Sequence, residues 1–454
     1  LGGLGQDQVR DAAGVLYEQL LRTKGVNQTA YRFAADVNID FISRVKELSI
    51  PGVSIEATTT RQYHTTYAAH LLGRVAAIDP DEWTSYYKTA DIDGDGEPDY
   101  QMNDTVGKEG AERAFENYLR GSSGVRALER NTSGKVVSET WLTDPKPGNN
   151  VVLTIDLDLQ GTVEDVLANS IPKLSSKEVE GAACVVLDVN NGDVLASASY
   201  PTFSLATYGQ DIAQNSSNPL KPLTNRALTG TYPPGSTFKM VTAIAGLEEG
   251  IITPSTKILD KGAYTYYPGT PPKCWIYRQH GTTHGLVNVS EAIKVSCNYF
   301  FYECGSRLGE TRLYQYAAAF GLTSKTGIDL PGEVRSVVGS QNTLYDPTKP
   351  VGESSQDTSR PIIVFNSIKS HLKKCGESRG MEYDDERLSS CAKRLMDMAV
   401  AYPESSWVEN MRTILMEELN MPRSMVYSNS VITDTYNYIN DIKWGGSQTI
   451  LTAI

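Results

Sequence analysis

The sequence predicts a mixed α/β (α+β) fold built from two or three domains. The chain has 454 residues, which is too many for one ordinary hydrophobic core. Apolar residues make up 40% and charged residues 21%, a balance typical of a folded globular protein rather than a disordered one. Segments with the two-residue alternation of strands are mixed with segments that have the spacing of amphipathic helices.

Charge and apolar runs limit the possible partners. A formal net charge of −12 without any basic stripe argues against a nucleic-acid partner. No run approaches the roughly 18 consecutive apolar residues that a membrane helix needs. The sequence has neither an initiating Met nor a leader-like start, so we expect a fragment of a longer protein.

A cluster of Pro, Gly and Asn over 143–150 indicates a domain boundary. Before it, a helical pattern over 8–25 is followed by a strand-like segment over 53–63 and a long polar stretch. We therefore expect a first domain over 1–147 and a second over 148–454.

The second domain begins with an alternating, β-rich segment over 151–160 that passes into a helix through Leu167. Two strands follow within 181–201, joined by a tight turn at 190–193. From about 341 to 443, amphipathic helices separated by polar loops predict an inserted helical subdomain. Between the hairpin and this insert, helical spacing covers 236–247, 289–308 and 312–320.

Ser236 is the strongest candidate for a catalytic nucleophile. It follows Pro-Pro-Gly at 233–235, which imposes a fixed entry into a helix. Because that helix is almost wholly apolar, we expect Lys239, one turn later, to be buried with it. Burial lowers the pKa of a lysine from its usual ~10.4, and the neutral amine can then activate a serine hydroxyl. The helix N-terminus also offers backbone N–H groups to a developing oxyanion.

The alternative interpretation makes Ser236 a helix cap, with Lys239 extending to solvent. The S-x-x-K spacing alone does not decide between them, because it recurs where we expect ordinary surface pairs. These recurrences are Ser170–Lys173, Ser370–Lys373 and Ser390–Lys393.

Ser296 and Asn298 form an S-x-N pair within an apolar and aromatic helical segment. The same spacing at Ser216–Asn218 and Ser340–Asn342 lies in polar, loop-like surroundings. Polar groups among apolar neighbours need partners, so this pair is the second element that a Ser-Lys enzyme requires.

Two motifs, NRALTGTYPPGSTFKMVTAIAGLEEG at 225–250 and VSCNYFF at 295–301, closely resemble those of the class B penicillin-binding proteins. These are the monofunctional D,D-transpeptidases of bacterial peptidoglycan synthesis and cell shape. The resemblance covers about 65–336 and resumes at 444–454. Further stretches that agree are AAHLLGRVAAI, GKEGAERAFENYLRG, VVLTIDLDLQ, VVLDVNNGDVLASASYPTF and FGLTSKTGIDLPGE.

The resemblance implies a penicillin-binding, serine β-lactamase-like transpeptidase domain, with an antiparallel sheet covered by helices and a helical insert. Region 1–147 would be an elongated pedestal and dimerisation domain. The protein would be anchored at the extracytoplasmic face of the bacterial membrane by an N-terminal helix absent from this chain. Its partners would be a glycosyltransferase and other membrane proteins of cell-wall synthesis.

The resemblance also implies roles for four residues. Ser236 would attack a D-Ala carbonyl of a peptidoglycan stem peptide on a lipid-linked glycan strand, forming an acyl-enzyme. Lys239 would be the general base, Ser296 a proton relay, and Asn298 a residue that holds the geometry. β-Lactams would acylate Ser236 as inhibitors, and neither a metal nor an organic cofactor would be needed.

The family has a third motif, Lys-Thr-Gly on a strand beside the cleft. Lys325, Thr326 and Gly327 imitate it, but they lie soon after Ser296 and precede a loop-like Pro-Gly turn. We reject them as that motif and expect the true one beyond residue 454. The fragment itself is therefore predicted to be inactive.

Two alternatives stay open for the function: a β-lactam-hydrolysing or β-lactam-sensing Ser-Lys enzyme, and a non-catalytic scaffold of cell-wall synthesis. The six cysteines show no spacing typical of a zinc site or a disulfide framework. His280 and His284 are interpreted as loop residues rather than metal ligands. The acidic segment 91–99 is interpreted as a surface turn, with a weak calcium site as the alternative.

Overall fold

The computed structural model divides the chain into two compact units, Leu1–Gly230 with Asp329–Glu333, and Thr231–Ile328 with Val334–Ile454. The residues that it describes are 5–24, 33–34, 37–48, 50, 53, 55, 61–92, 94, 96–102, 104–132, 136–176, 179, 181–267, 269–355 and 359–454. Among these residues, no helix combines the length and the apolar character needed to cross a membrane.

The first unit begins with helices and short antiparallel pairs. Helix α1 (Gln6–Lys24) forms where the helical pattern predicted it. The segment 53–63 lies largely outside the described residues, and its described members are not in a strand. The remaining elements before 150 are α2 (Ile39–Leu48), α3 (Ala69–Leu72), β1 (Val75–Ala77), α4 (Pro80–Ser85), η1 (Tyr87–Thr89), β2 (Thr105–Gly107), α5 (Gly110–Ala114), α6 (Glu116–Leu119), β3 (Val125–Arg130) and β4 (Val136–Thr143).

The predicted hairpin is present as β5 (Ala182–Leu187) and β6 (Val194–Tyr200), paired antiparallel. Helix α7 (Leu157–Ser170) packs on β6, where the buried Gln160 bonds to both the N–H and the C=O of Ser197. The prediction of a strand over 151–160 is wrong. Asp156 caps α7 early by accepting from the Leu159 N–H, and the preceding residues stay outside any strand. Around this hairpin, the unit also contains η2 (Ile171–Lys173), α8 (Tyr208–Ser217) and α9 (Arg226–Thr229).

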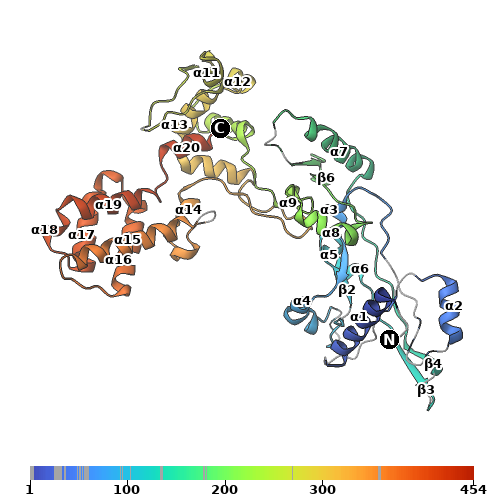
Figure 1. Ribbon diagram of the computed structural model, residues 1–454. Helices are drawn as coiled ribbons and strands as arrows, with labels where there is room; N and C mark the ends of the chain where they lie inside the picture. The colour runs from blue at the N-terminus through green and yellow to red at the C-terminus, as the bar shows by residue number, and fades with distance from the viewer. Residues whose placement is uncertain are drawn as a thin grey trace. The chain divides into compact units, whose positions relative to one another are not determined.

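The second unit is centred on three helices that pack in sequence, α10 (Lys239–Glu248) on α13 (Asn298–Ala319), and α13 on α20 (Gly446–Thr452) (Figure 1). Two glycines on these helices allow the close approach, since a Cβ at Gly246 would lie 2.6 Å from the Cys304 sulfur, and one at Gly305 would lie 2.4 Å from the Ala453 Cβ. The core contains the fully buried Phe300 and Phe301. Its smaller elements are η3 (Gly235–Phe238), β7 (Ile258–Asp260), α11 (Trp275–His280), β8 (Gly285–Val287) and α12 (Val289–Lys294).

Two helical predictions in this unit need correction. The predicted helix over 289–308 is interrupted between α12 and α13, where Ser296 adopts a left-handed conformation with φ 51°. The predicted helix over 312–320 is the second half of α13, after a kink at Gly309. The prediction that the apolar helix α10 is buried is only partly right. Lys239 is buried, but Met240 on the outer face of α10 is 52% exposed.

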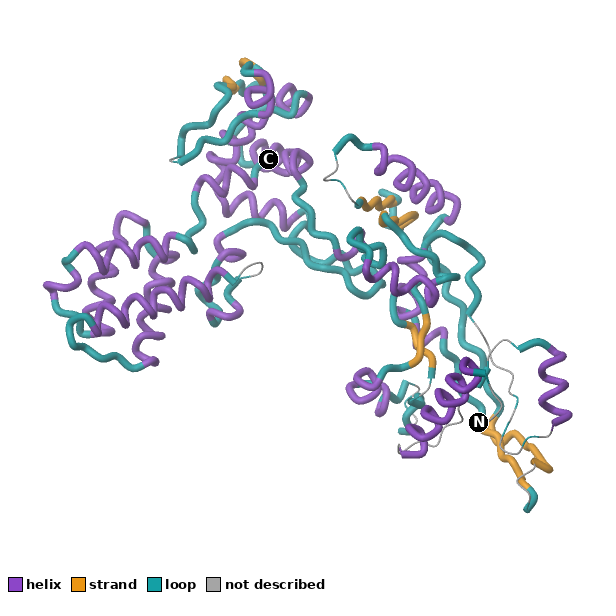
Figure 2. The backbone as a smooth tube through the Cα atoms, in the orientation of Figure 1, coloured by secondary structure: helices purple, strands orange, loops and turns teal. Residues whose placement is uncertain are grey.

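In the described part of 341–443 the predicted insert consists of helices joined by loops, without a strand, as Figure 2 shows. Its helices enclose a hydrophobic core of their own, which includes Trp407, Met411 and Leu395. The mixed α/β fold and the helical insert are therefore confirmed, whereas the boundary between 147 and 148 stays a prediction. The insert comprises α14 (Gln341–Leu344), η4 (Val351–Glu353), α15 (Arg360–Glu377), α16 (Asp385–Ala401), η5 (Glu404–Ser406), α17 (Trp407–Leu419), α18 (Arg423–Val426) and α19 (Asn429–Asn440).

Candidate active site

Ser236 and Lys239 lie at the entrance to α10, as the Pro-Pro-Gly sequence predicted. Ser236 is exposed in the 3-10 turn η3, whereas Lys239 is only 2% exposed. The Lys239 Nζ lies 3.1 Å from the Ser236 Oγ. The alternative in which Lys239 extends to solvent is therefore wrong, because its amine points inward toward the serine.

Ser296 and Asn298 complete a closed network around the same amine. The Lys239 Nζ lies 2.9 Å from the Ser296 Oγ, 3.0 Å from the Ser296 carbonyl oxygen and 2.5 Å from the Asn298 Oδ1. The Ser296 hydroxyl also donates to the Ser236 Oγ at 2.9 Å. The structure thus brings all four predicted residues together, with the two serine hydroxyls and the amine in mutual contact.

The buried position of Lys239 makes its amine easier to deprotonate than that of an exposed lysine. Burial lowers the pKa of Lys239 from 10.5 to about 8, although any negative charge on the nearby Cys274 and Cys297 thiols opposes this change. A neutral amine has a lone pair that can accept the Ser236 proton. The site therefore combines an accessible hydroxyl with a buried amine within hydrogen-bond distance of it.

Two of the other occurrences of these spacings have separate partners. Lys393 forms an ion pair with Asp397, while Ser390 donates to Glu418. Ser340 caps α14 by accepting from the Thr343 N–H. The segment 324–333, which contains Lys325, Thr326 and Gly327, is a loop rather than a strand.

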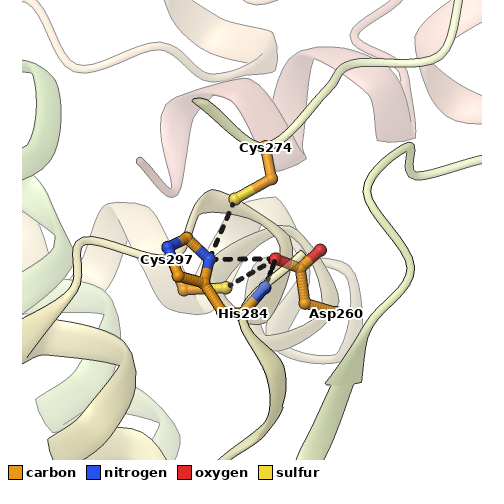
Figure 3. A group of neighbouring side chains, drawn as sticks. All are labelled: Asp260, Cys274, His284 and Cys297. Atoms are coloured by element: carbon orange, nitrogen blue, oxygen red, sulfur yellow. Dashed lines mark hydrogen bonds and ion pairs between the residues drawn. The ribbon is translucent and has the colours of Figure 1, made fainter. Parts of the chain in front are cut away.

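A second cluster of reactive side chains includes Cys297, the residue between Ser296 and Asn298 in the sequence (Figure 3). Asp260 ends β7, Cys274 precedes α11, His284 precedes β8, and Cys297 stands between Ser296 and Asn298. The candidate ligand atoms of the four residues lie within 4.8 Å of one another. The structure thus brings His284, interpreted from the sequence as a loop residue, together with two of the six cysteines in a group that could hold a metal ion.

The geometry of this cluster is compact. The His284 Nδ1 lies 2.9 Å from the Asp260 Oδ2 and 3.5 Å from the Cys274 Sγ. The Cys297 Sγ lies 3.6 Å from the same carboxylate oxygen. Asp260 is 2% exposed, and both thiols are fully buried.

The electrostatics of the cluster suit a cation. Burial alone would raise the pKa of the Asp260 carboxyl, but hydrogen bonds from His284 and Gly262 hold it below its usual value. The hydrogen bond with Cys297 lowers the pKa of the Cys274 thiol to about 6. A buried carboxylate beside an ionisable thiol is costly without a positive partner. Two sulfurs, one imidazole and one carboxylate form a donor set of the kind that binds Zn²⁺ tetrahedrally.

No spacing in the sequence indicates this cluster, because its members lie in four separate parts of the chain.

The acidic segment 91–99 is interpreted from the sequence as a surface turn, with a calcium site as the alternative. Asp91 accepts from the backbone of Gly94 and Gly96, as in a surface turn. Asp93 and Asp95 lie outside the described residues, so the calcium alternative stays a hypothesis.

Two family descriptions match the chain. "Penicillin binding protein transpeptidase domain" matches residues 182–356, and "Penicillin-binding Protein dimerisation domain" matches residues 6–153.

Named relatives agree with these families. The chain is 34% identical over 304 residues to "Peptidoglycan D,D-transpeptidase MrdA" of Acinetobacter baumannii, covering 66% of this chain and 42% of that protein. It is also 34% identical over 293 residues to "Stage V sporulation protein D" of Bacillus subtilis, covering 64% and 39%. The chain thus spans less than half the length of these relatives.

Solved structures show the same fold. One, described as "Structural coordination of polymerization and crosslinking by a peptidoglycan synthase complex", matches with 29% identity and a TM-score of 0.53, over 72% of this chain and 57% of that one. The complex of PBP2 with MreC from Helicobacter pylori matches with 22% identity and a TM-score of 0.57, over 75% and 63%. The two family descriptions and the named relatives, with the ordered motifs around Ser236 and Ser296, show that the chain belongs to the class B penicillin-binding proteins.

Proposed function

We propose that the protein is a peptidoglycan D,D-transpeptidase that acts through an acyl-enzyme on Ser236. The observation that carries this proposal is the position of the Lys239 Nζ, within hydrogen-bond distance of the Ser236 Oγ, the Ser296 Oγ and the Asn298 Oδ1. The relatives named as D,D-transpeptidases support the same reaction.

In the first half-reaction, the Ser236 Oγ attacks the carbonyl carbon of the penultimate D-Ala of a stem peptide, and neutral Lys239 accepts the hydroxyl proton. The C–N bond to the terminal D-Ala then breaks, and its amine leaves with a proton relayed through Ser296. In the second half-reaction, an amine of a neighbouring stem attacks the ester and gives its proton back along the same path. Asn298 holds the Lys239 amine in place throughout.

The geometry favours acyl transfer to an amine over hydrolysis of a β-lactam. A β-lactamase needs a base that activates a deacylating water, commonly a carboxylate. Among the described residues, no carboxylate is hydrogen-bonded to Ser236, Lys239, Ser296 or Asn298. A scaffold without catalysis would not need this network of contacts.

The proposed setting is the extracytoplasmic face of the bacterial membrane, where lipid-linked glycan strands carry the stem peptides. Partners would include a glycosyltransferase and other membrane proteins of cell-wall synthesis. Relatives solved in a peptidoglycan synthase complex and with MreC support such partners.

Labelling of the full-length protein with a fluorescent penicillin tests the proposal. We expect a stable adduct on the wild type that is lost in Ser236→Ala. Ser390→Ala, which alters an S-x-x-K pair in the insert, should label normally. Rapid release of hydrolysed drug would instead support a β-lactamase, and the absence of any adduct would support a scaffold.

We also propose a second function, binding of a zinc ion by Asp260, Cys274, His284 and Cys297. The burial of all four side chains and the convergence of their ligand atoms support it. A bound ion would offset the buried negative charge and tie together β7, α11, β8 and the start of α13.

Metal analysis of the purified chain tests this second proposal independently of catalysis. We expect about one zinc ion per chain, and a thiolate-to-metal absorption band after exchange into cobalt. Both should be lost in Cys274→Ser and His284→Ala but kept in Cys391→Ser, which changes a buried cysteine outside the cluster. A metal-free wild type that binds no cobalt would contradict the proposal.

A further inference from the structure

Ser296 has an unusual backbone conformation for its residue type. Its φ of 51° places it in the left-handed region, one of four such non-glycine residues in the described part of the chain. For a residue with a Cβ this conformation is strained, because the Cβ approaches the following carbonyl oxygen. It persists only where the surrounding structure holds it.

The left-handed turn brings Ser296 to the catalytic lysine. Because the chain leaves α12 and turns before α13, both the Ser296 Oγ and the Ser296 carbonyl oxygen lie within 3.0 Å of the Lys239 Nζ. A continuous helix would direct that carbonyl to a backbone N–H four residues later. The turn is therefore what makes Ser296 available as a proton relay.

Two side chains from other elements contact the backbone of this turn, Lys239 at the Ser296 carbonyl and Trp275 at the residue before it. The Trp275 Nε1 donates to the carbonyl oxygen of Val295, the residue immediately before Ser296, at 3.0 Å. Val295 is the C-cap residue of α12, and carbonyl groups at the C-terminus of a helix lack partners within the helix. The other bonds at the turn, Ser296 N–H to Ile293 and Cys297 N–H to Ala292, are internal to the end of α12.

Trp275 is itself well fixed. It is the first residue of α11 and directly follows Cys274, and its ring lies 5.6 Å from the ring of His284. Its indole is half-buried, so the N–H···O bond to Val295 is shielded from water. A hydrogen bond shielded in this way constrains the orientation of the 295–296 peptide more strongly than an exposed one.

We propose that Trp275 is a positioning residue for the acylation step, acting through Val295 on the orientation of Ser296. This role rests on the proposed transpeptidase function. Without the indole N–H, the Val295 carbonyl loses its side-chain partner, and the 295–296 peptide is constrained less tightly in the orientation that places the Ser296 Oγ beside Ser236 and Lys239. Trp275 touches no reacting atom, so its effect depends entirely on Ser296.

The test compares Trp275→Phe with Trp444→Phe in the full-length protein, using the rate constant of acylation by a fluorescent penicillin. Trp444 is a matched control because its Nε1 also makes one hydrogen bond, to the Thr449 Oγ1 at 3.1 Å. We expect a loss of about tenfold to a hundredfold for Trp275→Phe and less than about twofold for Trp444→Phe.

Repeating Trp275→Phe in a Ser296→Ala background separates positioning from general destabilisation. If Trp275 acts through Ser296, the second change has no further effect on acylation; an equal loss in both backgrounds would overturn the inference. Benzothienylalanine at position 275 removes only the N–H donor and serves if the Phe variant does not fold. A wild type that takes no label would refute the proposed function itself, whereas a labelled wild type with an unaffected Trp275→Phe would refute only this role.

Discussion

At the scale of single residues, the pKa of Lys239 determines how the site should respond to pH. Burial lowers this pKa to about 8, so the amine is mostly protonated below that pH and cannot accept a proton from Ser236. We therefore expect the rate of acylation to rise with pH through about 8 and then to level off. Stopped-flow acylation of the full-length protein from about pH 6 to about pH 10 checks this. A rate that is flat or falls across that range would contradict the role of Lys239 as a base.

Asn298→Asp should move this profile. The Asn298 Oδ1 lies 2.5 Å from the Lys239 Nζ, and a carboxylate there would stabilise the protonated amine. We expect the midpoint of the acylation profile to rise by about one to three pH units. Asn298→Ala, which removes the contact without adding charge, should reduce the rate without an upward shift. Equal midpoints in wild type and Asn298→Asp would show that Lys239 does not control the profile.

The sequence located the four candidate catalytic residues because each lies in a short motif with a distinctive setting. Ser236 stands after Pro-Pro-Gly, and Ser296 stands among apolar residues. Their assigned roles stay predictions. The cluster of Asp260, Cys274, His284 and Cys297 was not predicted, because Asp260 and Cys297 are 37 residues apart and meet only through tertiary packing. The contact of Trp275 with Val295 was not predicted for the same reason.

At the scale of elements, the spacing of apolar residues predicted most helices correctly but did not predict where a helix is interrupted. The helices of the insert follow their amphipathic spacing because each covers a shared core. The break at Ser296 has no local signature, since Trp275 and Lys239, which are distant in sequence, stabilise it. The alternation over 151–160 resembled a strand, but the Asp156 cap starts α7 within that segment.

The contact between α13 and α20 gives a test at this scale. A Cβ at Gly305 would lie 2.4 Å from the Ala453 Cβ, so Gly305→Ala should force the two helices apart. We expect a loss of about 1–3 kcal/mol in the free energy of unfolding, measured by chemical denaturation. Gly352→Ala is the control, because nothing lies within 4 Å of its added Cβ. Equal stability of the two variants would show that these helices are not closely packed.

At the scale of the whole molecule, composition predicted an insert and a division near 143–150. The dimerisation-domain description ends at 153, just after this division, and the transpeptidase-domain description begins at 182. The compact units of the structure instead divide at Gly230. Contacts between distant segments determine such units, and composition along the chain does not encode them.

The insert has the properties of an independently folding module. Its hydrophobic core is a separate cluster from the one around α10 and α13. Gln341 joins the two ends of the insert, because its Nε2 donates to the Ile442 carbonyl at 2.9 Å and its Oε1 accepts from the Trp444 N–H at 2.8 Å. Ends that lie this close allow a segment to be removed or to fold alone without loss of the surrounding structure.

We therefore expect residues 340–444, expressed alone, to be helical by circular dichroism and to unfold in one cooperative transition. In the full-length protein, replacing 346–440 by a short Gly-Ser linker should leave penicillin labelling of Ser236 intact, since none of the contacts of the catalytic network comes from that segment. Gln341→Ala in the isolated segment should lower its melting temperature, because the hydrogen bonds of the Gln341 side chain with the Tyr345 and Ile442 carbonyls and with the Trp444 N–H are lost. An isolated segment without cooperative unfolding, or an excised protein that no longer labels, would mean that the insert supports the catalytic core.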